Sequence, residues 1–448
     1  METVKRNLLT RFKLNPPRSL ALGFMLLIVI GAFLLNLPIA SQDGKSIGII
    51  DALFTSASAV CVTGLVVVNT ATHWTSFGQV VILLLIQIGG LGIMTMATIV
   101  AIISGRKISF KERLVIKEQL NQETLSGLVK LTKYVIYLTL AIEAFGAIIL
   151  STRFIPQYGL KEGIWFSIFH SISAFCNAGF DITGNSFIDY NNSAIFILTI
   201  SSLIVLGGLG FGVILDVVRN RSWKKLSLHS KLVISFTVFL IVTGSIIFYL
   251  LESNNPLTMQ DFTLKEKVLA SMFSSITPRT AGFNTIDTSA LRQSSSLFTI
   301  ILMFIGGSPG STAGGVKTVT MGVLIISTIS IIRGERDVEV FKRRIPYETI
   351  FKSIAIIIIG MTIVFFVTFI LTLTEDQEFL NLLFETTSAF GTVGLSRGIT
   401  SELSRSGKII LTMTMYAGRV GPLTLAFAVG YKEEHKRYRY AEGNITVG

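Results

Sequence analysis

A segment of twelve residues that recurs four times constrains the fold of this chain more than any other feature. The copies read FTSASAVCVTGL, FHSISAFCNAGF, MFSSITPRTAGF and FETTSAFGTVGL, and their penultimate residues are Gly64, Gly179, Gly282 and Gly394. Eight positions before each glycine stands a hydroxyl residue: Ser56, Ser171, Ser274 or Thr386. The glycines are 115, 103 and 112 positions apart, and so regular a period indicates one structural unit used four times.

Long apolar runs flank every copy of this segment. They cover residues 19–40, 74–103, 131–152, 192–218, 230–251, 294–332, 349–373 and 407–430, and predict eight membrane-spanning helices. Half of the 448 residues are hydrophobic and only 15% are charged, which places the chain in the membrane class. The twelve-residue segments are too short to cross about 30 Å of hydrocarbon. Irregular backbone at that depth occurs only against protein or a water-filled cavity.

We therefore predict an all-α polytopic membrane protein with four tandem helix–pore-loop–helix repeats and pseudo-fourfold symmetry around a central pore. The predicted organisation is a cytoplasmic N-terminus (1–18), repeat 1 (19–104), a cytoplasmic linker with repeat 2 (105–219), repeat 3 (220–333), repeat 4 (334–431) and a cytoplasmic C-terminal tail (432–448). Within the linker, the charged segment 108–127 is expected to be a solvated helix. The first apolar run lacks a convincing cleavage site, so it is predicted to be a retained helix.

The net charge of +12 is distributed unevenly between the two sides of these helices. Of the 39 Lys and Arg residues, 26 fall in the terminal segments and alternate loops, and nine fall in the opposite loops. This asymmetry places both termini in the cytoplasm and predicts a multi-pass protein of the plasma (inner) membrane in contact with anionic lipids. It argues against a nucleic-acid partner. Cys61 and Cys176 lie in apolar segments, so no disulfide framework is expected.

Each short segment is predicted to be a half-helix that points its negative C-terminal end at the pore axis, where it favours a cation. The small residues that follow can aim carbonyl oxygens at the lumen, as in a potassium filter. The predicted ion-binding residues are Val62, Thr63, Gly64, Asn177, Ala178, Gly179, Thr280, Ala281, Gly282, Thr392, Val393 and Gly394. The alternative is that these glycines only let helices pack closely. Arg279 stands where the other copies have cysteine or glycine, so the symmetry is expected to be approximate.

The stretch GGSPGSTAGGVKT interrupts the sixth apolar run. It is not a phosphate-binding loop, because Gly315 stands one position too early before Lys317 and no strand precedes it. Similar elements are GGLG at Gly89, GGLG at Gly207 and AGRVG at Ala417. Glycine and proline break helices, so we predict an intramembrane loop over 306–317, below the filter, that acts either as a gate or as a static lining. The predicted gate residues are Gly306, Gly307, Ser308, Pro309, Gly310, Ser311, Thr312, Ala313, Gly314, Gly315 and Lys317.

The four turns VTGL, NAGF, TAGF and TVGL, the GGSPGSTAGGVKT loop and the AGRVGP element resemble those of the Trk/Ktr/HKT potassium transporters over nearly the whole chain. The short N-terminus is similar to that of the bacterial Ktr-type membrane subunit. The resemblance implies potassium uptake without enzymatic activity, K⁺ as the transported ion and Na⁺ as a candidate activator. It also implies a homodimer on a cytoplasmic ring of nucleotide-binding regulatory subunits, and an intramembrane gate at the loop. In the plant branch a serine at the first filter glycine accompanies sodium preference, so Gly64 favours potassium.

Several charged residues fall within or next to the apolar segments. Arg419 is predicted to raise a barrier to cations below the filter, as the family resemblance implies, or to cap carbonyl groups. Glu143 either binds a coupling ion or is paired at a helix interface. Asp51 is expected to cap the first half-helix, and His170 and Glu385 are expected to begin half-helices and bond neighbouring helices. The alternative functions are therefore an ion-coupled (Na⁺ or H⁺) potassium symporter and a Na⁺-conducting relative.

Overall fold

The computed structural model describes residues 16–93, 95–96, 110–119 and 128–421, together with residues 424, 443 and 446. The predicted N-terminal segment up to residue 15 and most of the predicted C-terminal tail lie outside this description. The regular secondary structure of the described residues is helical, apart from a short hairpin of β1 (Glu339–Val340) and β2 (Arg343–Arg344). This agrees with the predicted all-α class.

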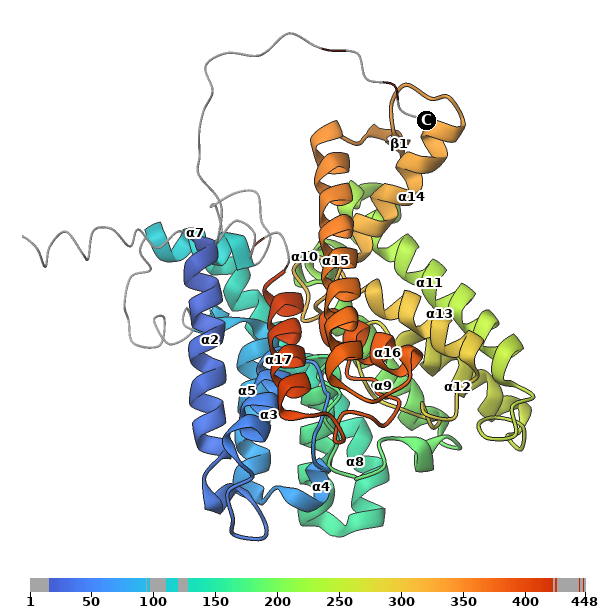
Figure 1. Cartoon of the computed structure of the whole chain (residues 1–448). Helices are drawn as coiled ribbons and strands as arrows, with labels where there is room; N and C mark the ends of the chain where they lie inside the picture. The colour runs from blue at the N-terminus through green and yellow to red at the C-terminus, as the bar shows by residue number, and fades with distance from the viewer. Residues whose placement is uncertain are drawn as a thin grey trace, which may run out of the picture.

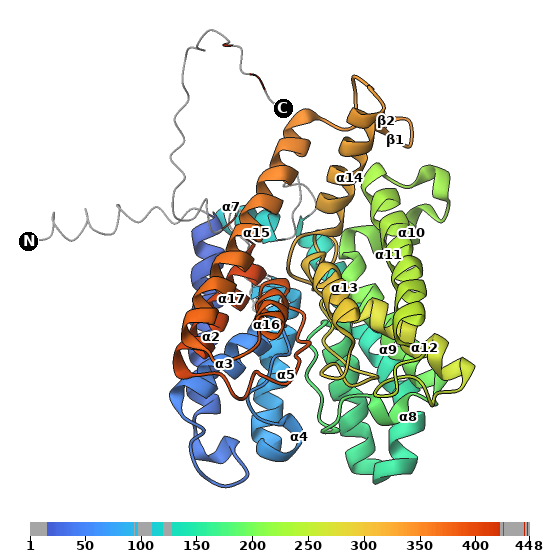
Figure 2. The same cartoon turned by 45° about the vertical axis from the view of Figure 1, so that its right-hand side comes forward.

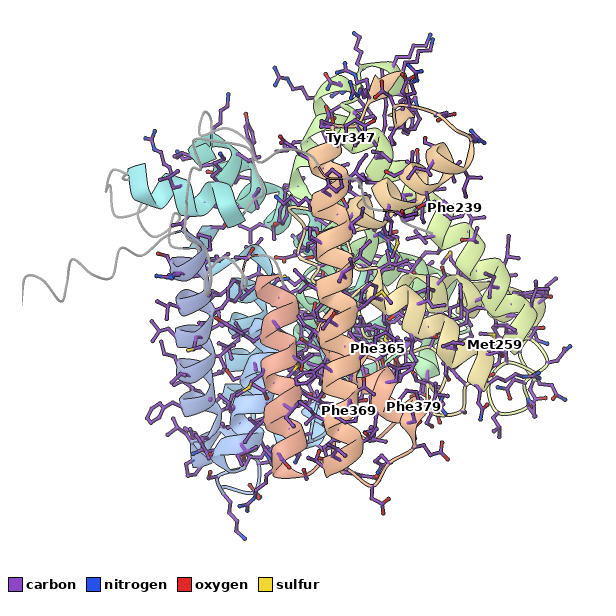
Figure 3. All side chains as sticks on the ribbon, turned by 45° about the horizontal axis from the view of Figure 1, so that its top comes forward. Phe239, Met259, Tyr347, Phe365, Phe369 and Phe379 are labelled. Atoms are coloured by element: carbon purple, nitrogen blue, oxygen red, sulfur yellow. The ribbon has the colours of Figure 1, made fainter. Side chains whose placement is uncertain are left out.

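Four long helices form the outer helices of the four repeats. They are α2 (Pro16–Leu35), α8 (Leu128–Phe175), α11 (Leu228–Glu252) and α15 (Tyr347–Thr374). Each is long and apolar enough to cross a membrane. Many of their large side chains are exposed, such as Phe365 and Phe369 of α15, at 56% and 61% (Figure 3). Apolar residues exposed along a whole helix are expected where the helix faces lipid.

Each outer helix leads into one of the predicted half-helices. These are α3 (Ile49–Val60), the last part of α8, α12 (Leu264–Ile276) and α16 (Phe379–Gly391). In the second repeat the outer helix and the half-helix are joined across a kink at Gly159, whose φ is 80°. Glycine reaches this φ without the steric cost that other residues incur, so the chain can reverse direction there.

Among the described residues, the inner helices of the four repeats each break or end within their predicted apolar runs. They are α5 (Ser76–Leu91), α9 (Ala194–Leu209) with α10 (Phe211–Asn220), α13 (Gln293–Phe304) with α14 (Thr318–Ile332), and α17 (Arg405–Val420). α9 and α10 are bent by 97° at Gly210, and α5 and α17 end at Gly92 and Gly421, all with φ between 85° and 94°. The predicted loop in repeat 3 thus corresponds to the positions at which the other inner helices bend or end at a glycine.

The prediction of eight spanning helices did not anticipate the bend in repeat 2, whereas the loop in repeat 3 was predicted; the later parts of the apolar runs 74–103 and 407–430 lie largely outside the described residues. Among the described residues, the four outer helices meet the length and composition needed to cross a membrane, and α9 with α10 adds a fifth if the bent pair counts as one span. The apolar runs in the sequence continue through the glycine breaks, because glycine does not interrupt hydrophobicity. The breaks are set by backbone conformation, which hydropathy does not report.

Three half-helices dock on their outer helices through a hydroxyl group that fits against a glycine. Ser56 and Ser171 donate to outer-helix carbonyl oxygens at 2.7 and 2.6 Å. In repeat 3 the same contact is made by Ser275, at 3.1 Å, and not by Ser274, the hydroxyl residue eight positions before Gly282. The glycines that make room for these hydroxyl groups are Gly31, Gly146 and Gly244. The docking hydroxyl of repeat 3 thus stands seven positions before its filter glycine, whereas those of repeats 1 and 2 stand eight positions before theirs.

The two ends of the molecule differ in character. The start of α2, the helix α7 (Phe110–Gln119) and the β1–β2 hairpin lie at one end, and α4 (Thr70–His73) and the kink of α8 lie at the other (Figures 1 and 2). α7 is not fully solvated as predicted, since Val115 and Ile116 are buried and the helix packs on α2. The basic linker and the basic hairpin therefore share one end of the protein.

Candidate ion pathway

The four predicted filter turns share one backbone conformation. The residue two positions before each glycine has a left-handed φ, which is 58° at Val62, 59° at Asn177, 71° at Thr280 and 51° at Thr392. The following glycines have φ values of 93°, 70°, 77° and 92°. A positive φ is unfavourable for β-branched residues such as valine and threonine. Its recurrence in all four repeats indicates that the surrounding structure imposes it.

The four turns contact one another in a closed ring. A side-chain carbon on each filter glycine would lie under 3.0 Å from the carbonyl oxygen that precedes the next repeat's glycine. These contacts pair Gly64 with Ala178, Gly179 with Ala281, Gly282 with Val393, and Gly394 with Thr63. Each repeat therefore meets the next, and the last meets the first. Only glycine fits at so close an approach, and the order of contacts gives the pseudo-fourfold arrangement that the sequence predicts.

Each turn is anchored to the C-terminal end of its own half-helix. In repeat 1 the N–H of Thr63 donates to the carbonyl oxygen of Ser58 at 2.7 Å, and the N–H of Gly64 donates to Ser58 Oγ at 3.0 Å. Ser388 accepts the corresponding two bonds in repeat 4. The negative ends of the half-helices therefore adjoin the ring of turns, and helix C-terminal ends in general favour positive charge.

The ring departs from exact symmetry in its side chains. The amide of Asn177, oriented to donate to two carbonyl oxygens, places its oxygen 3.3 Å from Thr280 Oγ1. Thr63 and Thr392 have buried hydroxyl oxygens without a hydrogen-bond partner among the described residues. Arg279 is 5% exposed and donates to Thr237 on α11 at 3.3 Å. The second and third turns are thus linked by side chains, whereas the first and fourth keep free oxygens.

The loop between α13 and α14 connects two opposite repeats beneath the ring. On one side, the N–H of Ser308 donates to Gly208 O at 2.9 Å, and Thr312 Oγ1 donates to another carbonyl of α9 at 3.1 Å. On the other side, a side-chain carbon on Gly314 would lie under 3.0 Å from Thr392 Oγ1. The predicted gate residues therefore span from repeat 2 to the base of the fourth filter turn.

Two basic side chains hold carbonyl groups of this loop. The guanidinium of Arg419 donates to Thr312 O and to two carbonyl oxygens of α5, one of them Gly90 O at 3.1 Å. Lys317 Nζ donates to Ala313 O at 2.7 Å. Arg419 thus acts as a carbonyl cap, the second of the two roles considered for it. Its positive charge still lies beside the loop under the ring, so the two roles are compatible.

The contacts of the inner-helix glycines correct the predicted register of the fourth repeat. Gly89, Gly207 and Gly418 each pack directly on the last carbonyl groups of a half-helix, at Val60, Phe175 and Phe390 respectively. Gly418, and not the predicted Ala417, is therefore the counterpart of the first glycine in each GGLG element. Arg419 then occupies the position of Gly90 and Gly208.

Glu143 and Asp51 both have polar partners among the described residues. Glu143 is 5% exposed, accepts from Gln87 Nε2 at 3.2 Å and lies 3.9 Å from Cys176 Sγ, which agrees with pairing at a helix interface. Asp51 was predicted to cap α3, and this prediction was wrong. It lies in the first turn and forms an ion pair with Lys408 of α17 at 2.8 Å.

His170 and Glu385 lie inside their half-helices and not at their starts, so that prediction was wrong. His170 bonds a backbone group after the second filter turn, and Glu385 bonds Thr400 after the fourth. No periodic pattern in the sequence marks these contacts.

Comparisons with known proteins agree with this geometry. The TrkH family model, described as a cation transport protein, matches residues 20–437. The Ktr system potassium uptake protein B of Bacillus subtilis is 45% identical over 436 residues, which cover 97% of each chain. The potassium/sodium uptake protein NtpJ of Enterococcus hirae is 42% identical over 444 residues, which cover 98% of each chain.

A solved structure extends the comparison to the fold. The potassium transporter TrkH from Vibrio parahaemolyticus superposes with a TM-score of 0.73 at 17% identity, covering 93% of this chain and 86% of that one. At this identity the likeness supports the fold alone. The full-length relatives confirm the resemblance to the Ktr-type membrane subunit, and a transporter family agrees with the prediction that the chain is not an enzyme. The chain belongs to the TrkH family of cation transport proteins.

Proposed function

We propose that this protein takes up potassium by channel-like, K⁺-selective translocation through the ring of four glycine turns. The closed ring of contacts among the four turns is the observation that carries this proposal. The negative ends of four half-helices adjoin the ring, and the unpaired hydroxyl groups of Thr63 and Thr392 add oxygens to it. Such an oxygen-rich site can replace the hydration shell of a monovalent cation.

The loop over 306–317 is proposed to be the gate. It lies between repeat 2 and the base of the fourth turn, where Arg419 and Lys317 bond its carbonyl groups. Glycines within it give the backbone freedom to rearrange. Movement of the loop would need these hydrogen bonds to break, so an outside contribution of free energy is required. We propose that a cytoplasmic nucleotide-binding ring subunit supplies it, as the name "Ktr system" of the relatives suggests.

We further propose a homodimer in the plasma membrane, with one pore in each chain and both termini in the cytoplasm. The basic linker and hairpin at one end of the molecule support this orientation, because cytoplasmic loops carry excess Lys and Arg. A Na⁺-conducting or Na⁺-activated protein is the second candidate. It is favoured by the 42% identity to a protein named for potassium and sodium uptake.

Flux into proteoliposomes that contain the chain tests the proposal. Wild-type protein is expected to carry K⁺ in preference to Na⁺, and Gly64→Ser is expected to lose this preference, because the new side chain would meet the Ala178 carbonyl of the second turn. Gly44→Ser is the control, since Gly44 also has a positive φ but has no neighbour within 4 Å. Equal K⁺ and Na⁺ flux in the wild type would favour the second candidate.

The same assay separates the gate from a static lining. Deletion of residues Ser308 to Ala313 removes the hydrogen bonds to α9 and Arg419, so a gated pore is expected to conduct more in the absence of any partner. A deletion variant that folds but conducts no more than the wild type would indicate that the loop does not block the pathway.

A further inference from the structure

One position in the half-helices differs among the repeats in a way that the filter turns do not explain. It lies just before the docking hydroxyl in repeats 1, 2 and 3 and just before Thr386 in repeat 4, and its occupants are Thr55, His170, Ser274 and Glu385. In repeats 2 and 4 this residue is a long polar side chain that reaches the segment after the filter glycine. In repeats 1 and 3 it is a short hydroxyl residue that does not form a hydrogen bond to that segment.

In repeat 4 a buried carboxylate braces the outer end of the turn. Glu385 has no exposed surface, and one of its oxygens accepts a hydrogen bond from Thr400 Oγ1. Thr400 also bonds Ser396 Oγ at 3.0 Å, and Ser396 lies two residues after Gly394. The carboxylate therefore holds the first residues beyond the filter. A buried carboxyl group is costly unless it is bonded, so this bond strongly favours one position of the segment.

In repeat 2 an imidazole performs the same task. His170 has no exposed surface, and its Nδ1 lies 2.7 Å from the carbonyl oxygen of Phe166. The carbonyl can only accept, so Nδ1 carries the proton and Nε2 is the acceptor. Nε2 then accepts from the backbone N–H of Ile182 at 3.2 Å. Ile182 lies three residues after Gly179, so this turn too is fixed at its outer end.

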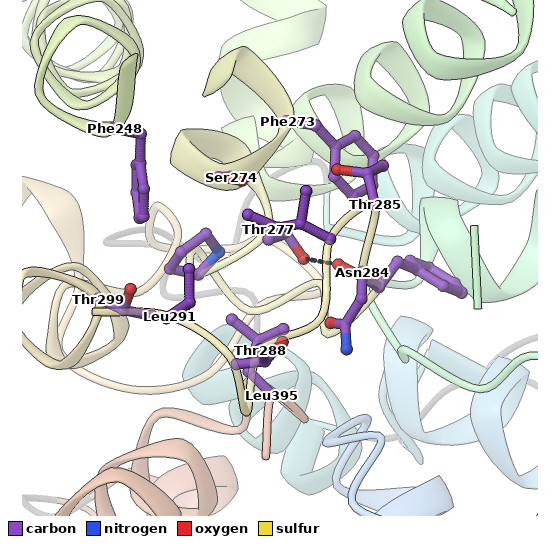
Figure 4. Close-up of a pocket in the computed structure, with 13 residues that line it drawn as sticks. Phe248, Phe273, Ser274, Thr277, Asn284, Thr285, Thr288, Leu291, Thr299 and Leu395 are labelled. Carbon is purple, nitrogen blue, oxygen red and sulfur yellow. Dashed lines mark hydrogen bonds between the residues drawn. The ribbon is translucent and has the colours of Figure 1, made fainter. Parts of the chain in front are cut away.

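Repeats 1 and 3 lack a brace at this position. Thr55 Oγ1 donates to Asp51 O of its own helix at 2.9 Å. Ser274 lines a small pocket of about 20 Å³ together with Asn284 and Thr285 (Figure 4). Asn284 Oδ1 and Thr285 Oγ1 have no hydrogen-bond partner among the described residues. A pocket therefore lies in repeat 3 beside the residue whose counterparts brace repeats 2 and 4.

We infer that Glu385 and His170 are positioning residues that set the K⁺ selectivity of the ring. This inference rests on the proposed function. Repeats 2 and 4 face each other across the ring, because the contacts run in the order 1, 2, 3, 4. The two braces therefore fix one diagonal of the filter at its outer end. Without them the two turns can relax away from each other, and a wider ring discriminates less well between K⁺ and Na⁺.

The test compares K⁺ and Na⁺ flux in proteoliposomes for variants at this position. Glu385→Gln keeps an oxygen that accepts from Thr400, and its K⁺/Na⁺ flux ratio is expected to stay within about twofold of the wild type. Glu385→Ala removes the bond and is expected to lower the ratio on the order of tenfold, the scale of a hydrogen bond to a charged group. Thr55→Ala is the matched control, and its ratio is expected to be unchanged.

A second variant keeps the test valid if Glu385→Ala does not fold. Glu385→Leu combined with Thr400→Val removes both partners, so no polar group of this bond is left buried alone. This pair is expected to fold and to show the same loss of selectivity. A pair that keeps the wild-type ratio would overturn the inference, even if its melting temperature is lower, because the bond would then serve stability only.

Gly64→Ser in the same assay separates this inference from the proposed function. If Gly64→Ser loses selectivity and the Glu385 variants keep it, the filter assignment stands and the positioning role fails. If the wild type has no K⁺ preference, both fail.

Discussion

At the scale of single residues, variants of Glu143 test whether transport is coupled to another ion or is passive conduction. Its carboxylate, on the outer helix of repeat 2, bonds Gln87 on the inner helix of repeat 1 and lies beside Cys176, next to the filter. We expect Glu143→Gln to transport K⁺ within about twofold of the wild type, because an amide can keep the bond to Gln87. Glu143→Leu is expected to lower the free energy of unfolding by about 1–3 kcal/mol, since it leaves the partners unpaired.

The measurements for Glu143 are K⁺ uptake under imposed Na⁺ or pH gradients and thermal unfolding in detergent. Uptake that an ion gradient drives in the wild type, and that Glu143→Gln abolishes, would show that this carboxyl group binds a coupling ion. The interface role would then be wrong.

At the scale of elements, two glycines of α2 test how the half-helices are held. A side-chain carbon on Gly31 would lie under 3.0 Å from both Ser56 of α3 and Leu85 of α5, whereas one on Gly23 would meet only Ile93, at 3.5 Å. Gly31→Ala is expected to lower stability by about 1–3 kcal/mol through overpacking. Gly23→Ala is expected to be neutral or to stabilise by up to about 1 kcal/mol, from helix propensity. Thermal unfolding of the two variants checks this, and equal melting temperatures would contradict the docking contact.

The same scale shows where sequence reasoning succeeded and where it failed. The four turns were correctly aligned with one another, because a glycine followed by Leu or Phe recurs in each, and the residue two positions before that glycine has a positive φ in all four. The register slipped by one residue in the third half-helix, at Ser275, and in the fourth inner helix, at Gly418. Counting from the filter glycine assumes that every repeat has the same number of residues between that glycine and each contact. In the structure this number differs by one residue between repeats, whereas the contacts of the hydroxyl groups and glycines with the backbone are retained.

At the scale of the whole molecule, the repeat predicts the ring but not the bonds that close it. Helices and half-helices follow from local patterns that recur four times. Arg419 joins three repeats through three backbone carbonyl groups, and Glu385 reaches a threonine 15 residues away. These contacts occur once each and have no period, so neither composition nor spacing identifies the partner.

The seam between the first and last repeats is the place where the ring depends most on such unique contacts. Asp51 in the first turn of α3 pairs with Lys408 of α17 at 2.8 Å, and 13% of the lysine side chain is exposed. In a double-mutant cycle with Asp51→Asn and Lys408→Met, we expect a coupling of about 1 kcal/mol in the free energy of unfolding, the upper range for exposed pairs. The control is Arg344 with Asp337 in the hairpin, at 55% and 40% exposure, where we expect almost none. Coupling equal to that of the control would mean that this ion pair does not help to hold the seam, which then rests on other contacts such as the bonds of Arg419 to α5.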